Sequence, residues 1–248
     1  MKKLIDSVYY YCQQLFEACL PSHCLLCYLP SKGSLICEHC NNAILTERQY
    51  CLHCGCGLAQ TQDFCGDCLQ HTFEFTQLHA VASYHPPFPQ LIKQLKYHHH
   101  LLYAELLGHL LADSLLQRYS ETQLQEIDYL IPVPLHQQKQ RKRGFNQAQL
   151  IMQSLIEKLP LKIASTTIIR NKFTNAQEGL TRHQRAVNLK NAFSLDRNTA
   201  LHLKGKHVVL IDDVVTTGAT INSLCQCLLN DAKVKRIDVW CICRTELE

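Results

Sequence analysis

Hydrophobic residues in the first twenty positions recur at the spacing of one helical face. Leu4, Ile5, Val8 and Leu15 follow this spacing, and polar residues interrupt the run. The pattern predicts an amphipathic helix over residues 1–20 that packs on the rest of the protein. A secretory leader or a membrane span would need a continuous apolar segment. We therefore expect a soluble, cytoplasmic protein with no membrane insertion.

From residue 73 onward, runs of apolar β-formers alternate with segments of helical periodicity. Strands are expected at residues 79–84, 128–133, 163–170, 207–211 and 236–243. Helices are expected around residues 91–95, at 101–116, at about 147–159 and at 220–229. This alternation predicts a doubly wound α/β domain over residues 73–248, with a mostly parallel sheet and helices on both faces. Ligands of such sheets bind at the carboxyl ends of the strands.

Cysteine dominates the amino-terminal part of the chain. Eleven of the fifteen cysteines precede residue 70, and eight of them form four successive C-x-x-C pairs. The pairs are Cys24 with Cys27, Cys37 with Cys40, Cys51 with Cys54, and Cys65 with Cys68. Two such pairs complete the four-sulfur shell that zinc prefers, so eight ligands predict two zinc ions. Consecutive pairing is the simplest arrangement, and the spacing does not exclude a crossed one.

We expect these cysteines to form a small double zinc-ribbon module over residues 21–72. A module this short folds poorly without such a staple, and a closed four-cysteine site leaves no open position for chemistry. A structural role is therefore favoured over a redox role, because redox C-x-x-C pairs usually occur singly. Cys12, Cys19 and Cys56 fall outside the pattern and are interpreted as packing or spare thiols. Zinc ribbons often bind nucleic acids or proteins, so an interaction role stays open.

Residues 208–220 contain the most specific pattern in the chain. Four apolar β-formers precede Asp212 and Asp213, and a loop of small hydroxyl residues then leads into a helix. Backbone N–H groups and threonine hydroxyls in such a loop can surround a phosphate, and the helix amino terminus adds partial positive charge. The acidic pair stands where a ligand hydroxyl or a metal ion would be. The phosphate-binding candidates are Val215, Thr216, Thr217, Gly218, Ala219 and Thr220.

Two basic segments could face further phosphates, although the net charge of +4 is too small to indicate nucleic-acid binding by itself. Residues 139–143 read KQRKR, and a second basic set is spread over residues 170–190. Arginines and a magnesium ion would stabilise negative charge on a phosphorylated ligand. The alternative is that KQRKR is a solvated surface, as most charge runs are. The candidates for this contact are Arg141, Arg143, Arg182 and Arg185.

The motif at residues 208–220 resembles the signature of type I phosphoribosyltransferases, in which the acidic pair contacts the ribose hydroxyls and the loop holds the 5-phosphate. The phrases IPVPL at 131–135, RKRGFNQ at 141–147 and LIKQLKY at 91–97, with the cysteine module, make the chain look like a member of the ComF family. The likeness covers essentially the whole chain after residue 20. It implies that residues 134–143 are the pyrophosphate loop and that residues 171–193 are the mobile flap of type I enzymes. It also implies a role in DNA uptake, natural competence or the use of DNA as a nutrient.

The leading hypothesis is a magnesium-dependent phosphoribosyltransferase that binds 5-phosphoribosyl-1-pyrophosphate (PRPP) and transfers its phosphoribosyl group to or from a nucleobase-like acceptor. Asp212 and Asp213 would orient the ribose and stabilise an oxocarbenium-like centre, and Arg182 would act with Arg141 and Arg143 on the pyrophosphate. No general base is identifiable. The second hypothesis keeps the ligand and drops the reaction: a PRPP sensor, or a single-stranded-DNA-binding accessory protein of the DNA uptake machinery.

Overall fold

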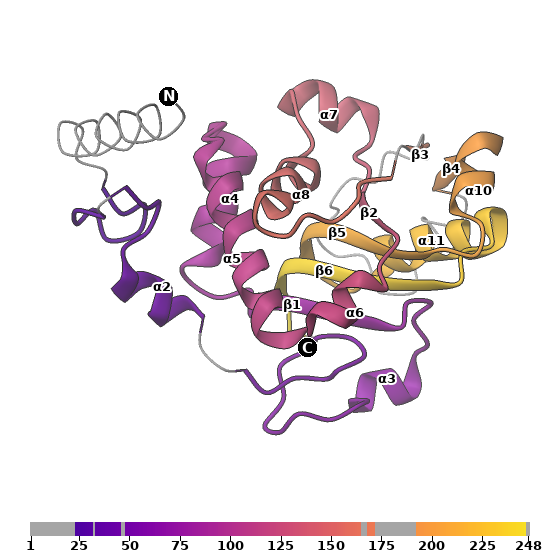
Figure 1. Ribbon diagram of the computed structural model, residues 1–248, viewed down its shortest axis with the longest axis horizontal. Helices are drawn as coiled ribbons and strands as arrows, with labels where there is room; N and C mark the ends of the chain where they lie inside the picture. The colour runs from indigo at the N-terminus through magenta and orange to yellow at the C-terminus, as the bar shows by residue number, and fades with distance from the viewer. Residues whose placement is uncertain (1–22, 32, 46–47, 165–167, 172–191, 247–248) are drawn as a thin grey trace, which may run out of the picture. The chain divides into compact units, whose positions relative to one another are not determined.

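A computed structural model describes residues 23–31, 33–45, 48–164, 168–171 and 192–246 (Figure 1). The chain divides into two compact units, Met1–Thr46 and Glu47–Glu248, which are described separately. The helix expected at residues 1–20 lies outside the described residues. No described helix has the combination of length and apolar character that a bilayer-spanning segment requires.

The first unit contains one cysteine knuckle followed by a short helix. The knuckle closes through the Tyr28 amide, which donates to the Cys24 carbonyl at 2.9 Å. Ser31 and Ser34 exchange hydroxyl-to-carbonyl hydrogen bonds of 2.6 and 2.7 Å across the following turn. Helix α2 (Glu38–Ile44) begins directly after Cys37. The two halves of the first C-x-x-C quartet are therefore joined by local hydrogen bonds rather than by a large apolar core.

The second unit is built on a four-stranded parallel sheet with the order β1-β6-β5-β2. The strands are β1 (Gln77–Ser83), β2 (Tyr129–Pro132), β5 (His207–Val215) and β6 (Arg236–Arg244). The two central strands, β5 and β6, are nine residues long and almost wholly buried. A strand covered on both faces must be apolar along its length, which explains the continuous hydrophobic runs in the sequence.

Helices cover both faces of this sheet, as the alternation of elements predicts (Figure 1). One layer contains α4 (Phe88–His98), α5 (Leu102–Arg118) and α8 (Gln147–Lys158). Gly108 allows α5 and α8 to approach closely, because an added Cβ would lie 2.6 Å from Ser154 Cβ. The other layer contains α10 (Arg197–Leu203), α11 (Ala219–Cys227) and the π-helical turn η1 (Leu228–Ala232). Alternate β5 residues, among them Val208 and Leu210, pack toward the α11 layer.

Several short elements had no counterpart among the expected ones. They are the helices α2, α3 (Gly66–Gln70), α6 (Glu121–Gln125), α7 (Gln137–Arg143) and α10, and the strand β4 (Phe193–Leu195). The strand expected at residues 163–170 is shorter: β3 (Ile168–Arg170) pairs antiparallel with β4, and Ile163 forms one isolated bridge with Leu130. Residues 134–143 were expected to form a loop, but they contain α7. This helix begins after His136, and a ring nitrogen of His136 accepts a hydrogen bond from the Gln138 amide at 3.2 Å. A basic run in a short helix gives little apolar periodicity from which the helix could be predicted.

The division into units differs from the expected module of residues 21–72. The cluster Cys51–Cys68 belongs to the same compact unit as the sheet, whereas Cys24–Cys40 belongs to the first unit. The Arg48 guanidinium donates to the Ala80 carbonyl at 3.2 Å and to the Ser83 hydroxyl at 3.0 Å, and so ties the segment before Cys51 to β1. The short spacing between the cysteine pairs led us to expect both clusters in one module. The second cluster instead belongs to the unit that contains the sheet.

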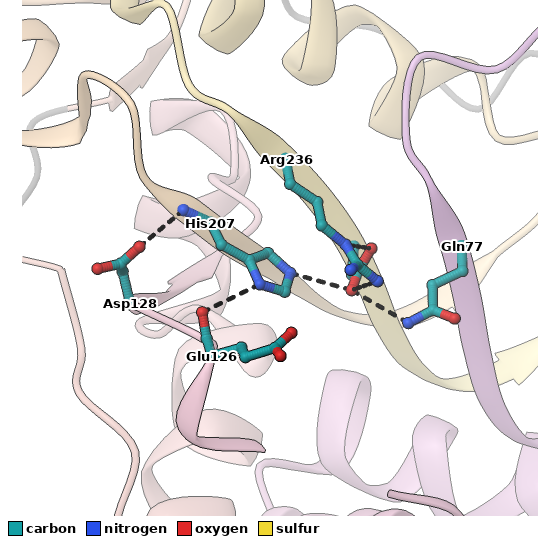
Figure 2. A network of polar contacts seen from close by, with 6 residues as sticks. Gln77, Glu126, Asp128, His207 and Arg236 are labelled. Carbon is teal, nitrogen blue, oxygen red and sulfur yellow. Dashed lines mark hydrogen bonds and ion pairs between the residues drawn. The ribbon is translucent and has the colours of Figure 1, made fainter. Parts of the chain in front are cut away.

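A polar network joins the amino ends of three parallel strands (Figure 2). The carboxylate of Asp238, on β6, lies 3.0 Å from His207 Nε2 and from Arg236 Nη2, and it accepts from Gln77 Nε2 at 3.1 Å. The other ring nitrogen of His207 lies 3.2 Å from the Glu126 carbonyl oxygen. The network provides partners for the buried carboxylate of Asp238 at the amino end of the sheet. Ligands of α/β proteins bind at the other end, at the carboxyl ends of the strands.

Candidate functional site

The loop between β5 and α11 has free hydrogen-bond donors. The amides of Thr216, Thr217 and Gly218 donate to no other residue in the described part of the chain. Gly218 has φ +76°, a conformation that side-chain-bearing residues rarely adopt, and α11 begins at the next residue. The Ala219 amide lies 3.4 Å from the Thr217 hydroxyl, which is a weak contact. Unsatisfied amides at the amino terminus of a helix are well suited to bind an anion.

This loop forms one wall of a cavity of about 140 Å³ at the carboxyl edge of the sheet. Among the sequence-predicted residues, the cavity is lined by Asp212, Asp213, Val215, Thr216, Gly218, Ala219 and Thr220. Thr217 is not among the lining residues that the structure describes. The opposite wall contains Gln147 from α8, Arg170 from β3 and residues 133–135 after β2. The sheet therefore brings the loop, the acidic pair and a half-buried arginine to one place.

The two adjacent aspartates lie in different surroundings. Successive side chains of a strand point to opposite faces, and Asp213 points toward the layer of α4 and α8. Its carboxylate forms an ion pair with the Lys96 ammonium and accepts from Gln147 Nε2 at 3.0 Å. Burial acts to raise the pKa of Asp213, but Lys96 and Gln147 outweigh it and hold that pKa below its usual value. Asp213 is thus an ionised, fully paired carboxylate.

Asp212 lacks such a cation partner among the described residues. Its Oδ1 accepts from the Asp213 amide at 2.8 Å. Burial, and then the negative charge of Asp213, raise the pKa of Asp212 to about 8. The cavity therefore presents one carboxyl group that changes its charge just above neutral pH.

The arginines predicted to contact pyrophosphate differ in how close they lie to the cavity. Arg143 lies with its guanidinium 5.9 Å from the Tyr97 ring centroid and donates to Gln147 Oε1, so one side chain separates it from Asp213. Arg141 is exposed on α7, and neither arginine is among the described residues that line the cavity. Arg182 and Arg185 lie outside the described residues. The described arginine that lines the cavity is the half-buried Arg170, which also lines a neighbouring cavity of about 260 Å³.

Sequence reasoning gave no role to Lys96 or Gln147. Both residues stand inside the phrases that carried the family resemblance, LIKQLKY and RKRGFNQ, but nothing in their spacing connects them with residue 213. Both reach Asp213 because α5 packs against α4 and against α8, and α8 lies on β5. The sequence did offer one signal for Lys96: it lies on the apolar face of its predicted helix. A lysine buried at such a position needs a charged partner.

The cysteines form two separate quartets of consecutive pairs. Cys24, Cys27, Cys37 and Cys40 form the first, and Cys51, Cys54, Cys65 and Cys68 form the second; within each quartet the sulfur atoms lie within 4.8 Å of one another. The sulfur–sulfur distances include 3.7 Å between Cys27 and Cys37 and 3.6 Å between Cys54 and Cys65. A tetrahedral ion with zinc–sulfur bonds of about 2.3 Å would separate its ligands by about 3.8 Å. Both quartets can therefore hold zinc.

Comparison with known proteins places these features in context. The family described as "Phosphoribosyl transferase domain" matches residues 141–246. DNA utilization protein YhgH of Escherichia coli is 38% identical over 228 residues, which cover 91% of this chain and 98% of that protein. Competence protein F of Haemophilus influenzae is 34% identical over 211 residues, 84% of this chain and 90% of the relative. Competence protein ComFC of Bacillus subtilis is 28% identical over 116 residues, 47% of this chain and 44% of the relative.

Proposed function

This chain belongs to the ComF family, and from that premise we propose that its cavity binds PRPP and that the protein transfers the phosphoribosyl group to or from a nucleobase-like acceptor. The observation that carries the proposal is the set of amides at Thr216, Thr217 and Gly218 that donate to no other described residue, next to the acidic pair. The role we propose is the one that the relatives' names indicate for them, in DNA utilization or competence. We place this activity in the cytoplasm, where thiols stay reduced and can bind zinc.

The loop would hold the 5-phosphate of PRPP. Three amides, the Thr216 and Thr220 side chains at the cavity wall and the amino terminus of α11 together provide donors without a lysine or arginine. Because the donors are fixed by the strand before them and the helix after them, binding requires little reordering of the loop.

The two aspartates would act on the ribose in different ways. Asp212, which lines the cavity without a cation partner, would accept hydrogen bonds from the ribose hydroxyls. Asp213 would reach the sugar only if Lys96 moved, so in its present contacts it contributes negative charge near the anomeric carbon. That charge would stabilise an oxocarbenium-like centre.

In the proposed reaction, the bond between the anomeric carbon and the pyrophosphate oxygen breaks, and its electron pair leaves with the pyrophosphate. A lone pair on an acceptor nitrogen forms the new bond to the same carbon, and the nitrogen then loses its proton to solvent. Arg141, Arg143 and Arg182 remain the proposed pyrophosphate contacts, with Arg170 as a further cation at the cavity. Magnesium would be carried mainly by the phosphate oxygens and water, as it usually is with phosphorylated ligands.

Calorimetry with PRPP and magnesium tests the binding step. At pH 9, above the pKa of about 8 at which Asp212 ionises, we expect heat and thermal stabilisation with the natural chain, and a loss of affinity of about tenfold or more with Asp212→Asn, since a charge-assisted hydrogen bond contributes about 1.5–3 kcal/mol. Asp113→Asn is the matched control, because Asp113 pairs with Lys158 on the helices away from the cavity. No binding by the natural chain would remove the proposal.

Catalysis is tested separately by the release of pyrophosphate when candidate bases are added. Release with at least one base supports the transferase. PRPP binding together with silence across a broad panel would favour the accessory role, in which PRPP is sensed and not consumed.

A second candidate function is single-stranded-DNA binding by the basic helix α7. Arg141 and Lys142 are exposed on this helix and do not line the described cavities, which leaves them available to a phosphate backbone. We expect affinity for a single strand to fall with added salt, and the slope to become shallower when both residues are replaced by glutamine. Salt-independent binding, or none, would exclude this function.

A further inference from the structure

Arg244 connects the second cysteine quartet to the end of β5. Its Nε donates to the Cys54 carbonyl at 3.0 Å, and its Nη1 donates to the Val215 carbonyl at 3.1 Å. Val215 is the last residue before the phosphate loop, and its carbonyl also accepts from the Thr245 amide at 3.1 Å. The Arg244 side chain is 1% exposed, so neither bond competes with bulk water. One planar guanidinium thus fixes the distance between a zinc-ligand residue and the loop.

Phe73 makes a second connection. Its ring packs against the cysteine quartet on one side and against Gly218 on the other, where an added Cβ would lie 2.8 Å from Phe73 Cε1. The next residue continues the contact, because the Glu74 amide donates to the Asn222 side chain of α11 at 2.7 Å. The segment that follows the last cysteine pair therefore contacts both the loop glycine and the first turn of the helix after the loop.

The charges are complementary in this region. No carboxylate among the described residues forms an ion pair with Arg244, which is nevertheless buried. A zinc ion with four thiolates carries a net charge of about −2, and it would lie close to this guanidinium. Loss of the metal would leave Arg244 as a buried cation beside four protonated thiols. Because a buried charge needs a compensating partner, the contacts of Arg244 would then be weakened.

We propose that the second cysteine quartet positions the phosphate loop, so that metal binding at Cys51, Cys54, Cys65 and Cys68 and PRPP binding at the loop are energetically coupled through Arg244 and Phe73. This inference rests on the proposed PRPP site. Coupling between two binding sites is reciprocal: a metal that raises PRPP affinity is itself held more tightly when PRPP is bound. Arg244 and Phe73 are positioning residues and not catalytic ones.

The test measures the equilibrium affinity for zinc by competition with a chromogenic chelator, with and without saturating PRPP and magnesium. The full-length chain carrying Cys24→Ser and Cys27→Ser is used, so that the signal comes from the second quartet. We expect PRPP to protect the zinc by raising its affinity about fivefold or more, which is the lower end of typical couplings. In the same background, Arg244→Lys should reduce that protection to less than about twofold, because an ammonium cannot reproduce the two-pronged geometry.

Arg48→Lys is the matched control. Arg48 also bonds a carbonyl and a hydroxyl in this region, but on β1 and not on the loop, so its replacement should leave the protection unchanged. If PRPP binds and does not alter the zinc affinity of the chain carrying Cys24→Ser and Cys27→Ser, the coupling is absent while the proposed function stands. Equal loss of protection in both lysine variants would also overturn the assignment to Arg244.

Hydrogen exchange tests the same coupling without PRPP. On removal of metal from the second quartet, the amides of Thr245, Asn222 and Glu74 should exchange faster, because each donates to or beside the loop. The Asp128 amide, bonded to the His207 carbonyl at the other end of the sheet, should not change. Unchanged exchange at all four amides refutes the proposal, even if the chain proves unable to bind PRPP.

Discussion

Two neighbouring residues, Asp212 and Asp213, differ in charge behaviour because a strand sends them in opposite directions. Asp213 has a lysine and a glutamine as partners, and its pKa is lowered. Asp212 has the charge of Asp213 beside it, and its pKa is raised to about 8. Their unequal states follow from side-chain alternation together with the position of Lys96 on α4.

The raised pKa of Asp212 predicts a pH-dependent stability difference. The folded chain holds a proton from the usual value of 3.8 up to about 8, whereas the unfolded chain has released it. This group's contribution to stability is therefore lost as pH rises through that window. Relative to the natural chain, Asp212→Asn should gain at least about 1 kcal/mol between pH 5.5 and pH 9, as measured by urea unfolding. A difference that is constant with pH would contradict the assignment.

Lys96 neutralises a carboxylate that is 3% exposed, so its removal leaves a buried charge without its partner. We expect Lys96→Met to destabilise the fold by about 3–5 kcal/mol. Adding Asp213→Asn should restore much of this loss, and the two single variants should therefore be strongly non-additive in a double-mutant cycle. Additive losses in denaturant unfolding would show that the two side chains act independently.

At the scale of elements, the sheet has separate functions at its two ends. The carboxyl ends of β2 and β5 form the cavity, whereas the amino ends of β1, β5 and β6 are joined by the Asp238 network (Figure 2). Burial acts to raise the pKa of Asp238, but His207, Arg236 and Gln77 lower it overall, so this carboxylate is ionised at neutral pH. The network should therefore affect stability without affecting the ligand.

Asp238→Asn tests this separation. We expect a loss of about 2–4 kcal/mol in the free energy of unfolding at pH 7, because an amide cannot compensate the neighbouring cations. PRPP affinity at a temperature where the variant is folded should stay within about twofold, since nothing connects the network to the loop except the rigid strands. A large loss of affinity would show that the two ends are coupled.

At the scale of the whole molecule, the two cysteine quartets belong to different compact units. We therefore expect loss of metal from each quartet to change the unfolding temperature of Glu47–Glu248 to a different extent. The natural chain should carry two zinc ions, and Cys24→Ser with Cys27→Ser should leave one. This variant should preserve the unfolding temperature of Glu47–Glu248, whereas Cys51→Ser with Cys54→Ser should lower it, because the second quartet belongs to that unit. Metal analysis and thermal unfolding followed by Trp240 fluorescence make the comparison. Equal shifts for the two variants would contradict it.

The amino-acid sequence by itself was sufficient for the α/β class, for the position of the loop at residues 216–218 at the carboxyl edge of the sheet, and for the grouping of eight cysteines into four C-x-x-C pairs. These features depend on local periodicity and spacing, which a linear chain displays directly. Short helices such as α7, whose polar residues lack periodicity, were not predictable in this way.

Only the tertiary structure decided which residues meet across the fold. It paired Lys96 and Gln147 with Asp213, moved the second quartet into the unit that contains the sheet, and placed Arg244 between Cys54 and Val215. Those contacts join positions that are between 29 and 190 residues apart, and they depend on how helices and loops pack on one sheet. Periodicity tells which face of an element is buried, but the identity of the neighbour is set by packing in three dimensions.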